Sequence, residues 1–78
     1  MIRFDFVCDG WMNYEFVMNF LTTTFGERAK PAIKNSKMGI YELLTHIPNE
    51  LAGQAFAEFC QLQRQGHVLN NVEFSVLY

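Results

Sequence analysis

The chain has 78 residues, of which 50% are hydrophobic and 15% aromatic, and its formal net charge is -2. A chain of this length has room for one core and buries only about 60% of its unfolded surface, so we expect one compact domain over residues 1–78. The apolar content excludes a disordered chain, and the acidic balance excludes binding of nucleic acid by bulk charge.

No apolar run approaches the roughly 18 residues that cross a bilayer, and the first ten residues, MIRFDFVCDG, do not resemble a signal peptide. We therefore expect a cytoplasmic protein that does not bind a membrane. The two cysteines, Cys8 and Cys60, form no metal-binding pair in the sequence, and we expect both to be reduced and buried.

The chain begins with a pattern of period two, which predicts a half-buried strand over residues 2–8. Its apolar side consists of Ile2, Phe4, Phe6 and Cys8. A helix follows to about Thr24, with Asp9 or Asn13 as its N-cap and Gly26 just beyond its end.

This helix is apolar around more than half of its circumference, wider than the stripe of roughly 100° that a core requires. At 100° per residue, Phe16, Val17 and Phe20 lie toward the sheet. The outer flank is rich in residue types that are common in protein interfaces. We predict that this flank binds a protein through Trp11, Met12, Tyr14 and Met18.

The last helix is expected from Asn49, its N-cap, to Gly66. Its predicted buried stripe is Ala52, Phe56, Phe59 and Cys60. Alternation over residues 72–78 predicts a final strand, with Val72, Phe74, Val76 and Tyr78 on one side.

The interpretation of residues 38–47 decides the fold. Ile40, Leu43, Leu44 and Ile47 have helical spacing, and this favours a helix that ends at Pro48. The predicted fold is then a small α+β domain with the order β-α-α-α-β, in which the terminal strands pair in an antiparallel sheet under two or three helices. The alternative is a strand, whose one face would consist of Tyr41, Leu43, Thr45 and Ile47. A short partner strand at residues 31–34 would join it through Asn35 and Ser36. The fold would then have the ferredoxin-like order βαββαβ.

Four of the six basic residues fall within ten positions, in a segment that we expect to be an exposed loop. They are Arg28, Lys30, Lys34 and Lys37. Such cations contact phosphates or acidic side chains, and an acidic protein partner fits better because the segment lacks interleaved aromatics.

Catalytic and metal-binding patterns are weak. Pairing of the terminal strands brings Cys8, Asp9 and His67 toward each other, but a thiol on an apolar strand face makes a poor nucleophile. Cys8, His46, Cys60 and His67 lack the spacing of a zinc site. We expect no enzyme activity, no metal and no cofactor.

These observations favour a non-catalytic protein-binding module, acting as a small inhibitor or adaptor of a larger protein or complex. Phage antagonists of host defence systems share this size and lack of motifs. The alternatives are a nucleic-acid-associated protein that uses residues 28–37, and a homodimeric structural or scaffold protein whose aromatic flank is its own interface.

Overall fold

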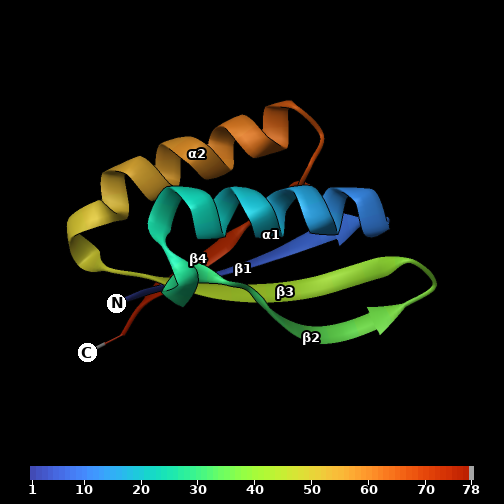
Figure 1. The fold of residues 1–78 in the computed structure, drawn as a ribbon, viewed down its shortest axis with the longest axis horizontal. Helices are drawn as coiled ribbons and strands as arrows, with labels where there is room; N and C mark the ends of the chain where they lie inside the picture. The colour runs from blue at the N-terminus through green and yellow to red at the C-terminus, as the bar shows by residue number, and fades with distance from the viewer. Residues whose placement is uncertain (78) are drawn as a thin grey trace.

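The computed structural model describes residues 1–77, which form a four-stranded antiparallel sheet with two helices on one face (Figure 1). The strand order is β2-β3-β1-β4. Neither helix of this region is long and apolar enough to cross a membrane. The elements in chain order are β1 (Ile2–Asp9), α1 (Trp11–Phe25), the 3-10 turn η1 (Glu27–Ala29), β2 (Ala32–Lys37), β3 (Ile40–Ile47), the 3-10 turn η2 (Asn49–Leu51), α2 (Ala52–Arg64) and β4 (Glu73–Val76).

Strand β1 is central, and its prediction is confirmed. Ile2 lies opposite Ile47 of β3 on one side and opposite Val76 of β4 on the other, so the terminal strands pair antiparallel as expected. Every second residue of β1 is buried under the helices: Ile2, Phe4, Phe6 and Cys8.

The predicted helix over residues 38–47 is wrong, because β3 occupies this segment. Met38 and Gly39 both have positive φ, 54° and 81°, and form a two-residue turn that pairs β3 with β2. Pairing on both sides of β3 outweighs the helical spacing of its apolar residues. The element order is therefore that of the βαββαβ alternative, and the β-α-α-α-β order is corrected.

The basic segment is ordered rather than a loop. Arg28 belongs to η1, while Lys34 and Lys37 lie on β2, an edge strand that extends beyond the predicted residues 31–34. The chain reverses at residues 38–39 instead of at Asn35 and Ser36, because glycine accepts the positive φ that this turn requires.

The helix starts also differ from the prediction. Gly10 is the N-cap of α1, and no side chain caps it; Asn13 instead donates a 2.8 Å hydrogen bond to the Asp9 carbonyl. Asn49 lies in η2, and α2 begins at Ala52. The 3-10 turn shifts the start of α2, and the buried face of α2 is accordingly Ala55, Phe59 and Leu62.

Three aromatic or thiol side chains that were expected in the core are exposed. Phe16 is 44% exposed and Phe56 37%, and Cys60 is exposed on α2. Phe59 is the buried aromatic residue through which α2 contacts β1, and its ring stacks on that of Phe4 with the ring centroids 4.7 Å apart. Strand β4 is shorter than the predicted residues 72–78, and Tyr78 lies outside the described residues.

Candidate protein-binding surface

The start of α1 and the β2–β3 turn form one end of the molecule. The Gly10 N–H donates a 2.8 Å hydrogen bond to the Gly39 carbonyl, which fixes the turn beside the helix. The large side chains here are mostly in solvent: Trp11 is 57% exposed, Met12 84% and Met38 92%. Met38 did not emerge from the sequence, because Met-Gly is not one of the dipeptides, such as Asn-Gly or Asp-Gly, that signal a two-residue turn.

The ring of Trp11 packs against the rings of two tyrosines. Its ring lies 5.3 Å from Tyr14 and 6.1 Å from Tyr41, and these two rings stack on each other at 5.0 Å with an angle of 14°. Tyr14 is only 8% exposed, so it belongs to the core and not to the exposed flank that was predicted. It positions Trp11 rather than offering contact area of its own.

Phe16 extends this surface along α1, contrary to the prediction that it packs against the sheet. Its ring stacks on the imidazole of His67 at 3.9 Å, and His67 Nδ1 lies 3.1 Å from Asn13 Oδ1. A shallow hollow of about 290 Å³ lies between Met12 and Phe16, with Glu15 and Asn19 completing its lining. We call Trp11, Met12, Phe16 and Met38 the Trp11 surface.

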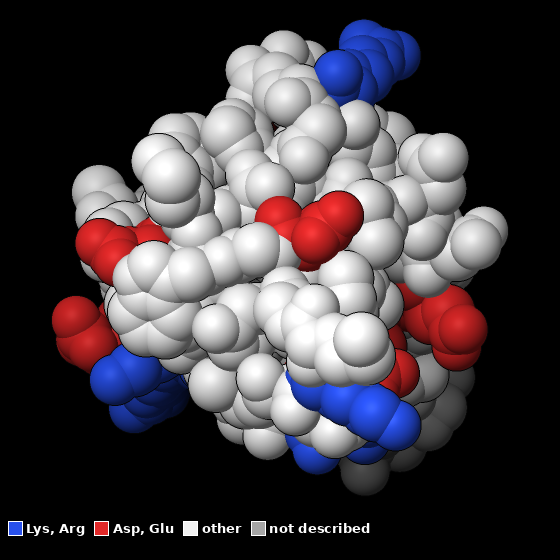
Figure 2. Space-filling view, turned by 90° about the vertical axis from the view of Figure 1, so that its right-hand side faces the viewer, with Lys and Arg blue, Asp and Glu red and all other residues white. Residues whose placement is uncertain are grey.

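Figure 2 views the molecule from this end: much of the face carries no charge, an acidic side chain lies near its centre, and the lysine and arginine side chains lie toward its periphery. Met18, the remaining predicted contact, is half-buried and packs against the core, so it is not part of the Trp11 surface. Of the four predicted contact residues, the structure therefore leaves Trp11 and Met12 well exposed.

The four cations of residues 28–37 do not form one patch. Arg28 and Lys30 lie at one end of β2 and Lys37 at the other, separated by roughly 20 Å of extended strand. Lys34 forms an ion pair with Asp5, with Nζ 2.8 Å from Oδ1. An anionic partner would therefore meet dispersed charges here.

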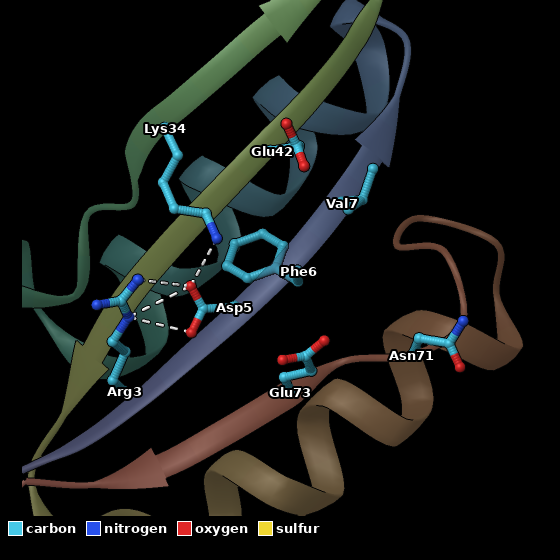
Figure 3. A pocket seen from close by; sticks show the side chains of 8 residues that line it. All are labelled: Arg3, Asp5, Phe6, Val7, Lys34, Glu42, Asn71 and Glu73. Carbon is cyan, nitrogen blue, oxygen red and sulfur yellow. Dashed lines mark hydrogen bonds and ion pairs between the residues drawn. The ribbon is translucent and has the colours of Figure 1, made fainter.

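The sheet face opposite the helices carries a polar hollow of about 320 Å³ (Figure 3). Asp5 lies within it and accepts hydrogen bonds from Arg3 and Lys34, and the Arg3 bond, more than that of Lys34, lowers the pKa of Asp5. Its lining combines both signs of charge: Arg3, Asp5, Phe6, Val7, Lys34, Glu42, Asn71 and Glu73. Among the described residues, the aromatic rings of β1 pack toward the helices, so they do not form on this face the stacking platform with which some sheets bind single-stranded RNA.

Asn13 links two of the residues considered for chemistry, because its side-chain amide donates to the Asp9 carbonyl and its Oδ1 lies 3.1 Å from His67 Nδ1. Cys8 is fully buried, and burial raises the pKa of its thiol to about 12. His67 contacts Asn13 and Phe16, and His46 lies on β3 opposite Arg3. Within residues 1–77, no cluster of three or more His, Cys, Asp or Glu side chains is arranged to hold a metal ion.

Comparison of the chain with protein-family models, with curated proteins and with solved structures gives no match. Function is therefore inferred from the geometry and chemistry of the surface.

Proposed function

We propose that this chain is a non-catalytic protein-binding module, an inhibitor or adaptor, which contacts a larger protein through the Trp11 surface. Trp11, Met12 and Met38 are its centre, and Phe16 extends it along α1. Single exposed apolar residues are normal on proteins, but a group of large ones gathered at one end of the molecule is typical of an interaction site.

The observation that carries the proposal is the backbone of Met38. Its φ of 54° lies in the left-handed region, where a residue other than glycine is less stable by roughly 1–2 kcal/mol. Asparagine is the favoured residue at this place in a two-residue hairpin turn, and it is also polar. A methionine that is 92% exposed there benefits neither the turn nor solubility, whereas it would supply adaptable apolar contact to a partner.

The packing of the Trp11 ring on two tyrosines also supports a role for Trp11 in binding. Its ring rests on Tyr14 and Tyr41, so it is held in place while more than half of it faces solvent. A side chain that is already ordered loses less entropy on binding, and tryptophan is enriched among residues that dominate binding energies.

The test is capture of partners from the native cell extract by the tagged chain, followed by affinity measurement with the purified partner. Trp11→Ala should weaken binding by about 2 kcal/mol, roughly 30-fold, if Trp11 is a dominant contact. Ile33→Ala is the matched control, since Ile33 is 47% exposed but lies near the other end of β2. Equal loss in both variants, or no loss in Trp11→Ala, would contradict the proposal.

A further inference from the structure

The two edges of the sheet differ in how they are protected against pairing. Strand β2 follows Pro31, carries Lys34 and Lys37, and has an irregular register between Ile33 and Asn35. Proline, lysine and bulges are the features that keep an edge strand from pairing with another chain. Strand β4 (Glu73–Val76), with the sequence EFSV, is short and carries one carboxylate, but it has no proline, no cation and no register shift.

Hydrogen bonds on either side of β4 establish the direction of its backbone groups. Leu77 N–H donates to the Met1 carbonyl, and Leu69 N–H donates to the Val7 carbonyl. Because antiparallel pairs alternate, the groups of Glu73 and Ser75 then face β1. The N–H and C=O groups of Phe74 and Val76 therefore point away from the sheet, along its outer edge.

Apolar side chains accompany this open edge. Phe74 is 58% exposed and Val76 44%, and the Phe74 ring meets Phe56 of α2 edge-on at 4.8 Å. Eleven large apolar side chains are exposed among the described residues; four form the Trp11 surface, and five lie along the β4 edge and the adjoining part of α2. Those five are Met1, Phe56, Phe74, Val76 and Leu77.

We propose that β4 pairs antiparallel with β4 of a second copy of this chain, about a two-fold axis at Ser75, and so joins two sheets into one. In this register Phe74 lies opposite the partner's Val76, and Val76 lies opposite the partner's Phe74. Within each of these two pairs, the outward-facing N–H of each residue donates to the C=O of the other. The only charged residue of the strand, Glu73, lies opposite the partner's Leu77, and the two Glu73 carboxylates stay four positions apart. The edge is thus complementary to itself in hydrogen bonding and apolar contact, and the register keeps the like charges apart, which favours a second copy over a foreign strand.

Sedimentation of the isolated chain tests the pairing. The expected species is a dimer that Val76→Pro converts to a monomer, because proline removes an outward-facing N–H but leaves the pairing of β4 with β1 intact. Val76→Thr keeps that N–H and should remain dimeric, and circular dichroism checks that both variants are folded. A monomer at all concentrations would overturn the proposal. A dimer that survives Val76→Pro but is lost in Trp11→Glu would also overturn it, since the Trp11 surface would then be the interface.

Cysteine cross-linking tests the register without weakening the interface. In a Cys60→Ser background, Ser75→Cys places two thiols at facing positions about 4.5 Å apart between Cα atoms, within the range that a disulfide spans. The control, Glu73→Cys, separates them by roughly 13 Å along the strands, which a disulfide cannot bridge. Ser75→Cys should therefore oxidise to a covalent dimer much faster than Glu73→Cys, and equal rates would refute the register.

Discussion

The Gly10 amide donates to the Gly39 carbonyl, and this bond couples the first turn of α1 to the β2–β3 turn. Trp11 follows Gly10 and Met38 precedes Gly39, so the side chains that we propose as binding residues flank a single backbone contact. Because Gly39 has a φ of 81°, the turn is sensitive to substitution. The position of the Met38 side chain depends on the same turn.

Met38→Asn should separate stability from binding. Asn-Gly is the favoured sequence for a turn with positive φ at both residues, so we expect the melting temperature to rise by a few degrees, on the order of 0.5–1 kcal/mol. Affinity for the partner should fall, because the exposed thioether is lost. Thermal unfolding and binding titration measure the two effects. A variant that is more stable and binds as tightly as the wild type would show that Met38 is not a contact residue.

Trp11 and Tyr14 should respond differently to truncation, although both lie in the first turn of α1. Tyr14 is buried between Trp11 and Tyr41, and Tyr14→Ala should cost about 3 kcal/mol in the free energy of unfolding. Trp11→Ala should cost no more than about 1 kcal/mol, since most of the ring is in solvent. Urea unfolding measures both, with Tyr14→Phe as the control that keeps the ring. Similar losses for Trp11→Ala and Tyr14→Ala would place Trp11 in the core.

The sequence pattern was sufficient for β1, for the existence of α1 and α2 and for the antiparallel pairing of the terminal strands, because alternation and helical periodicity are local signals. The exact helix starts were not predicted, since no side chain caps either helix. The pattern failed for β3, where Ile40, Leu43 and Leu44 fit a helix and only pairing with β1 and β2, which are distant in sequence or depend on the turn, decides otherwise. The helical wheel placed Phe16 inside and Tyr14 outside for a related reason. Their positions depend on His67 and Tyr41, which approach α1 from distant parts of the chain.

The two thiols should differ in reactivity in the native protein. Cys60 is exposed on α2, whereas Cys8 is fully buried and burial raises the pKa of its thiol to about 12. Because the thiolate is the reactive form, an alkylating reagent should modify Cys60 rapidly and Cys8 only after unfolding. Mass spectrometry should therefore show one modified cysteine in the native protein and two in the urea-treated protein. Rapid native labelling of Cys60→Ser would mean that β1 opens readily.

The ion pairs of Asp5 should make the stability of the fold depend on pH in the acidic range. The hydrogen bond from Arg3, followed by contacts with Lys34, lowers the pKa of Asp5 in the folded state. The contribution of this carboxylate is complete above its unfolded-state pKa of about 3.9 and is lost as the pH falls through the lower folded-state value. Asp5→Asn should thus unfold at a lower temperature than the wild type at neutral pH, and the difference should shrink as the pH falls below about 4.

Glu73→Gln provides the matched control for Asp5→Asn. Glu73 lies directly opposite Asp5 on β4, and like charges at facing positions of a sheet destabilise it. Neutralising Glu73 should therefore leave the melting temperature unchanged or raise it at neutral pH. Added salt should reduce the effect of Asp5→Asn, because both cations are partly exposed. A loss from Asp5→Asn that is the same at every pH would mean that the side chain acts through packing and not through its charge.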